Sequence, residues 1–204
     1  VQALSALQEP DNEDAISWSA SYYANKLISY LAETNPEIAY RFNADTLGVR
    51  SSRALRQLKE LQDEEGAWSW YKGMKGSRYM TTQVMELLAR LQMLTGKPLE
   101  EVEAKKLYTN GMAYLAKEAK KEYDILKKLD KEGKKPLIPS EQVLHYLYIC
   151  ALNGTGKGDE AKVNRYFIDR LVKLENAGAL TIYGKACSAV ILQLAGEENK
   201  AKEV

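Results

Sequence analysis

The residues of this sequence that can act as acids, bases or nucleophiles are few and far apart. The single histidine, His145, lies within an apolar helical pattern, and Glu141 precedes it by one helical turn. Histidine titrates near neutral pH and can act as a general acid or base, but no nucleophile accompanies His145 at a suitable spacing. We therefore predict that His145 is a structural residue.

Metal or cofactor chemistry has equally little support. A zinc site needs several Cys, His or carboxylate ligands at coordinated spacing, whereas the chain has one histidine and two isolated cysteines, Cys150 and Cys187. Each cysteine falls inside an apolar helical pattern, which predicts buried thiols outside any disulfide. We expect no metal site and no bound cofactor.

Two acidic pairs are the remaining catalytic candidates. Glu100-Glu101 lies in the first turn of a predicted helix, where the helix dipole already favours negative charge. Glu64-Glu65 lies at a helix end. Both pairs have a structural explanation, so we predict no catalytic residue and no enzyme activity.

The most distinctive segment of the chain is aromatic and reads LQDEEGAWSWYKG at 61–73. A polar helix end, a glycine and paired tryptophans precede the apolar segment 78–94, as expected for a junction between helices. The aromatic residues either pack this junction or form an interaction rim, since exposed Trp, Tyr and Arg side chains are common interface anchors. The candidate interaction rim consists of Trp68, Trp70, Tyr71, Lys72, Arg78 and Tyr79.

Composition and charge argue against other classes of protein. The 204 residues are 45% hydrophobic, enough to bury a substantial core, and the formal net charge is +1. A charge this balanced gives no reason to expect nucleic-acid binding. No apolar run reaches the roughly 18 residues that span a bilayer, so we expect no direct membrane insertion by this segment.

Apolar residues recur at three- and four-residue steps along most of the chain, and no segment alternates with a period of two. This pattern predicts an all-α chain with helices over about 13–33, 45–63, 78–94, 99–129, 140–152, 160–175 and 181–194. Candidate N-caps are Asp11, Asn12 or Asp14 for the first helix, and Ser140 and Asp159 for later ones; Gly96 is a candidate C-cap. We expect a possible break at Gly111 and a frayed tail over 196–204.

The expected helices differ in polarity along the chain. Segments 78–94, 140–152 and 181–194 are the more apolar ones, whereas 99–129 and 160–175 carry many charges. This alternation predicts an inner and an outer layer of helices. Weaker copies of the 61–73 pattern recur downstream, which indicates repeated helical hairpins arranged as an α/α toroid or solenoid.

Two family resemblances agree with that architecture. Gln62, Gly66 and Trp68 match the QW-type repeat motif of α/α-toroid proteins such as terpenoid cyclases, whose glutamine and tryptophan cap and pack helix junctions. The wider run 66–83 resembles the thioester-type (complement-like) domain of bacterial α2-macroglobulins, and so does 15–27. The resemblance covers about 11–196, although the second half matches mainly in helix order.

One departure from this family decides the chemistry. Thioester-bearing members have Cys-x-Glu-Gln at the start of the first toroid helix, where a cysteine sulfur and a glutamine side chain form a reactive acyl group. Here 10–18 reads PDNEDAISW, with neither residue. No internal thioester can form from this segment.

The resemblance implies a non-catalytic role within a larger protein. We expect 1–204 to be one α/α toroid-like domain, with a ring that is incomplete or completed by flanking sequence, in a much larger multidomain α2-macroglobulin-like protein. Such proteins trap or inhibit proteases, and without a thioester we expect the trapping to be non-covalent. The expected location is the periplasm or the cell surface, or outside the cell, with a lipid anchor in upstream sequence as one arrangement. The expected partners are other domains of the parent chain and a protease. The alternatives are a generic helical-repeat interaction scaffold and a toroid-fold enzyme such as a cyclase or polysaccharide lyase.

Overall fold

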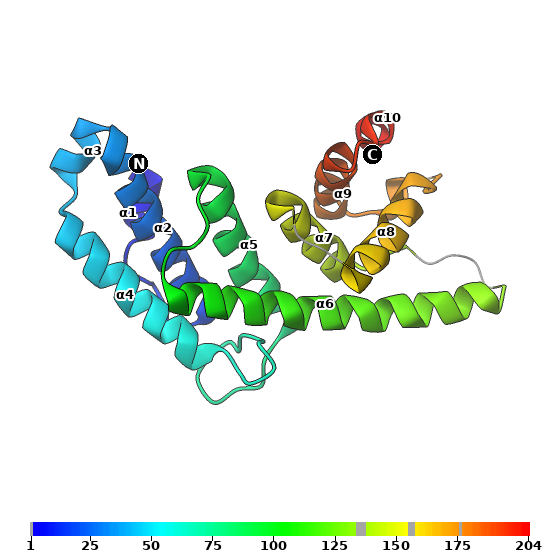
Figure 1. Ribbon diagram of the computed structural model, residues 1–204, viewed down its shortest axis with the longest axis horizontal. Coiled ribbons are helices and arrows are strands. Elements are labelled where there is room, and N and C mark those ends of the chain that lie inside the picture. Colours follow the sequence, from blue (N-terminus) through cyan, green and yellow to red (C-terminus); the bar gives the residue numbers. More distant parts are fainter. Residues whose placement is uncertain (1, 134–137, 155–157, 176) are drawn as a thin grey trace. The chain divides into compact units, whose positions relative to one another are not determined.

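The computed structural model describes residues 2–133, 138–154, 158–175 and 177–204. Within these ranges the chain forms helices and no strand, and an isolated antiparallel bridge joins Gln62 to Trp68 (Figure 1). The helices are α1 Gln2–Ala6, α2 Ala15–Thr34, α3 Pro36–Arg41, α4 Ala44–Leu61, α5 Arg78–Thr95, α6 Val102–Lys131, α7 Glu141–Asn153, α8 Asp159–Val172, the 3-10 helix Ala177–Ala179, α9 Ile182–Leu194 and α10 Glu198–Glu203. The prediction of an all-α chain is confirmed.

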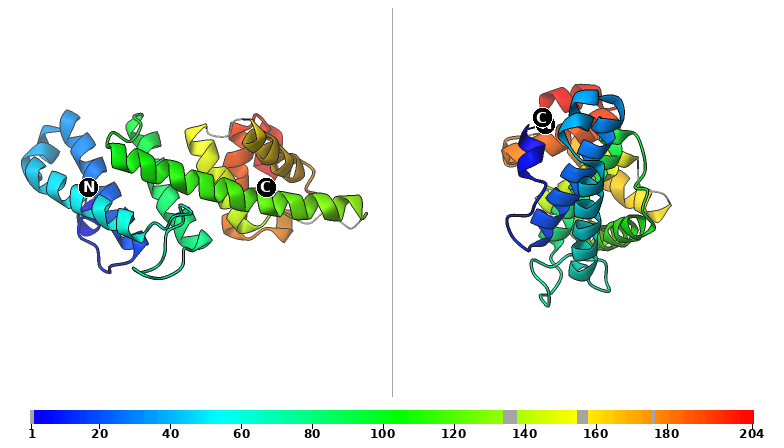
Figure 2. Two further views of the ribbon diagram at one scale, coloured as in Figure 1. Left: turned by 60° about the horizontal axis from the view of Figure 1, so that its bottom comes forward. Right: turned by 90° about the vertical axis from the view of Figure 1, so that its left-hand side faces the viewer.

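The chain divides into two compact units, Val1–Tyr114 and Leu115–Val204, and helix α6 contributes to both. In the first unit α2 is the central helix, because α1, α3, α4 and α5 all pack against it. In the second unit α9 packs against α7, α8 and α10. The helices of each unit can be followed in Figure 2. The single toroid-like domain expected from the sequence stays a prediction.

Most helix ends follow the capping residues expected from the sequence. Asp14 Oδ1 accepts a hydrogen bond from the Ser17 N–H at 2.8 Å, and the Ser140 hydroxyl accepts one from the Val143 N–H. Gly96 ends α5 in the left-handed conformation. The expected cap at Asp159 is wrong, because Asp159 is already the first residue of α8 and no side chain caps that helix.

Two segments expected to be irregular are helical. Asn35 caps α3 by accepting hydrogen bonds from the N–H groups of Glu37 and Ile38, and Pro36 occupies the first turn, where proline is well tolerated. The tail forms α10, which packs against α9, so the prediction that 196–204 frays is wrong. Both helices are too short for apolar residues to recur over several turns, so their hydrophobic pattern did not identify them.

Buried polar residues on α2 fasten the preceding segment to the core of the first unit. The Asn25 side chain donates hydrogen bonds to the carbonyl oxygens of Gln8 and Ser21, at 2.9 and 2.8 Å. The Gln8 side chain in turn donates to Asn25 Oδ1 at 3.1 Å. Each of these three residues is buried, and the mutual hydrogen bonds offset the cost of removing their polar groups from water.

Gly111 lies within α6 and does not break the helix. A Cβ atom on Gly111 would lie 2.5 Å from Met85 Sδ and 2.7 Å from Trp68 Cζ3, which is too close for either neighbour. The absence of a side chain at Gly111 therefore allows α6 to pack closely against Met85 and Trp68. Tertiary packing thus accounts for a residue that would otherwise weaken a helix.

We predict that Gly111→Ala lowers the free energy of unfolding by about 2 kcal/mol, because overpacking outweighs the better helix propensity of alanine. Urea denaturation followed by tryptophan fluorescence measures the change. The matched control is Gly48→Ala in α4, where a Cβ atom would meet nothing within 4 Å. That substitution should raise the free energy of unfolding by about 1 kcal/mol. Stabilisation by both substitutions would contradict the packing role of Gly111.

Candidate functional site

The predicted junction begins with Gln62, the residue that ends α4. Its Nε2 donates hydrogen bonds to the carbonyl oxygens of Gly66 and Leu107, at 3.1 and 2.9 Å. The first bond closes the turn after α4, and the second connects that turn to α6. The Gln62 side chain therefore ties the turn after α4 to α6, and its match to the QW-type motif stays a prediction.

Trp68 is the packing residue of the same junction. Its side chain is fully buried, and its indole Nε1 donates a hydrogen bond to the Leu58 carbonyl at 2.8 Å. Its backbone N–H donates to the Thr81 hydroxyl on α5, also at 2.8 Å. The inclusion of Trp68 in the candidate interaction rim is therefore wrong, because the ring belongs to the core.

Glycine is required at the turn between these two residues. Gly66 has φ +91°, a value that favours glycine, and a Cβ atom there would overlap the backbone carbonyl of Asn110 on α6. Asp63 supports the turn because its Oδ1 accepts hydrogen bonds from the N–H groups of Glu65 and Ala67, at 3.0 and 2.9 Å. Ser77 N–H donates to the Trp68 carbonyl at 2.8 Å and closes the loop that follows.

Four large apolar side chains remain exposed beyond this fixed base. We call them the aromatic cluster: Trp70, Tyr71, Met74 and Tyr79 are 41%, 50%, 54% and 48% exposed. The rings of Trp70 and Tyr79 stack, with centroids 6.0 Å apart and planes inclined by 17°. Sequence reasoning missed Met74, although its position between two glycines of a short loop was a usable signal.

The basic residues beside the aromatic cluster differ in their surroundings. Lys72 Nζ lies 2.7 Å from Glu60 Oε2, and the hydrogen bond to that carboxylate raises the pKa of Lys72. Lys75 is exposed, whereas Arg78 is partly buried at the start of α5. Lys72 and Lys75 are therefore the exposed basic side chains in the segment of the aromatic cluster.

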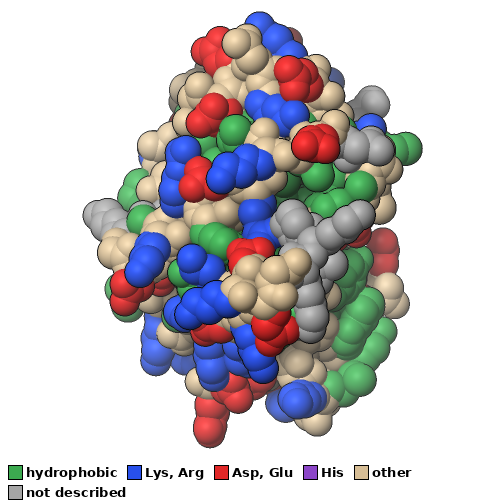
Figure 3. Space-filling model, turned by 90° about the vertical axis from the view of Figure 1, so that its right-hand side faces the viewer, with side chains coloured by type: hydrophobic (Ala, Val, Ile, Leu, Met, Phe, Trp, Pro, Cys, Tyr) green, Lys and Arg blue, Asp and Glu red, His purple; other side chains and the backbone are tan. Residues whose placement is uncertain are grey.

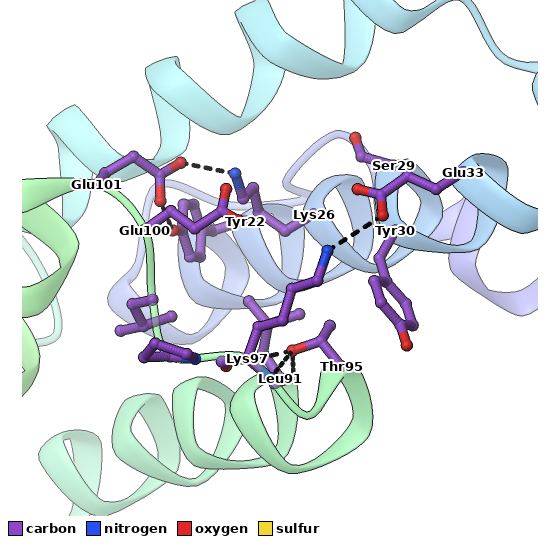
Figure 4. Close-up of a pocket in the computed structure, with 12 residues that line it drawn as sticks. Tyr22, Lys26, Ser29, Tyr30, Glu33, Leu91, Thr95, Lys97, Glu100 and Glu101 are labelled. Atoms are coloured by element: carbon purple, nitrogen blue, oxygen red, sulfur yellow. Dashed lines mark hydrogen bonds and ion pairs between the residues drawn. The ribbon is translucent and has the colours of Figure 1, made fainter.

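A small pocket of about 70 Å³ lies between α2 and the segment that joins α5 to α6 (Figure 4). Glu101 accepts hydrogen bonds there from Lys26 Nζ at 2.8 Å and from the Tyr22 hydroxyl at 2.9 Å. Lys97 Nζ lies 3.1 Å from Glu33 Oε2. These pairs tie the connecting segment to α2, and Glu100, which also lines the pocket, is exposed to solvent.

The pKa values in this pocket argue for a structural role. Burial alone would raise the pKa of Glu101, but the hydrogen bonds from Lys26, its own backbone and Tyr22 outweigh it and lower the pKa. Burial and the neighbouring Glu101 raise the pKa of Tyr22. A carboxylate with a lowered pKa and a phenol with a raised one are both poorly suited to proton transfer near neutral pH.

Glu64 and Glu65 are exposed in the turn after α4, whereas His145, Cys150 and Cys187 are buried in the second unit. His145 is 4% exposed, and its ring packs edge to face against Tyr183 at 5.4 Å between centroids. Cys150 and Cys187 are both buried and outside any disulfide, so that prediction is confirmed. Among the residues that the structure describes, no group of three or more His, Cys, Asp or Glu side chains is arranged to hold a metal ion.

Charged side chains of both signs are interspersed on the face shown in Figure 3. Ion pairs of this kind also lie along α6, where Lys120 pairs with Asp124 and Lys121 with Glu118. Nucleic-acid binding instead uses extended surfaces of positive charge. Across the described ranges, every helix is too short or too polar to cross a bilayer.

Comparison of the chain with protein-family models, with curated proteins and with solved structures gave no match.

We predict that Gln62→Ala lowers the free energy of unfolding by about 2 kcal/mol, because two hydrogen bonds, to the carbonyl oxygens of Gly66 and Leu107, are lost. Thermal or urea denaturation measures the change. Gln57→Ala on the same helix is the matched control, since no hydrogen bond of the Gln57 side chain is found among the described residues. Equal losses in the two variants would show that Gln62 does not hold the junction.

We predict that Glu101 makes the free energy of unfolding depend on pH in the acidic range. Its folded-state pKa is lowered, so its contribution is complete above the ordinary value of 4.5 and is lost as the pH falls through the folded value. The difference in unfolding free energy between wild type and Glu101→Gln should therefore be largest near neutral pH and shrink below about pH 4.5. The free energy of unfolding of the exposed neighbour variant Glu100→Gln should change with pH as that of wild type does. A pH-independent difference between wild type and Glu101→Gln would refute the lowered pKa of Glu101.

Proposed function

We propose that this chain is a non-catalytic helical domain of a bacterial α2-macroglobulin-like protein and takes part in non-covalent protease trapping. The observation that best supports this proposal is the Gln62–Trp68 junction. Its glutamine ties the turn after α4 to α6 and its tryptophan is buried against α4, which is compatible with the junction roles of the QW-type motif. The proposal places the chain in a secreted, periplasmic or cell-surface protein.

The residues at the start of α2 support a mechanism without acyl transfer. Segment 10–18 contains neither the cysteine nor the glutamine of a thioester, and Asp14 serves there as the helix cap. The two cysteines of the chain are buried in the second unit. Capture of a protease would then depend on conformational change and surface contact.

The aromatic cluster is the surface that we assign to such contact. Its side chains are about half exposed although the backbone at the base of the loop is held by hydrogen bonds. Aromatic side chains lose little conformational entropy on binding and contribute large contact areas. Partners for this surface are other domains of the parent chain or the captured protease.

A helical-repeat scaffold is the second candidate, favoured by the division of the chain into two compact helical units. Repeat proteins are built from such locally packed units and bind partners over extended surfaces. In this case the chain would bind a protein without changing protease activity.

The proposal can be tested on the full-length product of the reading frame that encodes this chain. The protein is incubated with trypsin, chymotrypsin or elastase, and residual activity is measured on casein and on a small chromogenic peptide. Trapping predicts that casein cleavage falls while peptide cleavage persists, because a trapped protease remains accessible to small substrates. The complex should dissociate in sodium dodecyl sulfate.

The aromatic cluster provides a matched pair of variants for the same assay. Trp70→Ala with Tyr79→Ala should weaken trapping by about tenfold or more, as expected for loss of anchor residues. Tyr40→Ala, at a side chain that is 93% exposed on α3, should have no effect. Unchanged casein cleavage with every protease would refute the trapping function and favour the scaffold.

A further inference from the structure

We draw no further inference here: the strongest candidate, the pocket between α2 and the segment that joins α5 to α6, has a volume of only about 70 Å³ and is bridged by the ion pairs of Lys26 with Glu101 and of Lys97 with Glu33, and nothing in the structure shows what it would bind.

Discussion

The buried indole of Trp68 is the constraint on which the first unit depends. Its ring is fully removed from solvent, so its N–H must find an acceptor inside the protein, and the Leu58 carbonyl of α4 provides it. The chain must therefore fold back on α4 directly after that helix ends, which the conformation of Gly66 permits. The same ring approaches Gly111 so closely that no larger residue fits on that face of α6.

Because the base of the loop is held this firmly, the side chains beyond it can remain exposed without loosening the fold. Trp70 and Tyr79 stack on each other, and this contact covers part of their surface while leaving each close to half exposed. A rigid turn that displays aromatic side chains is well suited to binding, since little entropy is lost when a partner covers them. This property connects the junction to the proposed contact surface.

Several ionisable groups among the described residues hold elements together. Glu101 binds Lys26 and Tyr22 and thereby secures the α5–α6 segment to α2. In the second unit, Asp130 on α6 accepts hydrogen bonds from Tyr166 and Arg170 on α8, which lower its pKa. Arg165 on α8 is likewise paired, with Asp169 and Glu197.

The main helices and most of their ends follow from local features of the sequence, because hydrophobic period, caps such as Asp14 and Ser140, and the glycine at Gly96 act locally. The sequence also indicated the Gln62–Trp68 junction, because the turn is short and its residues are close in the chain. Tertiary packing, in contrast, sets which aromatic side chains are buried: Trp68 and Trp70 are two residues apart, yet one is in the core and the other is exposed. The packing role of Gly111 likewise depends on the fold, because Met85 and Trp68 reach it from distant parts of the chain.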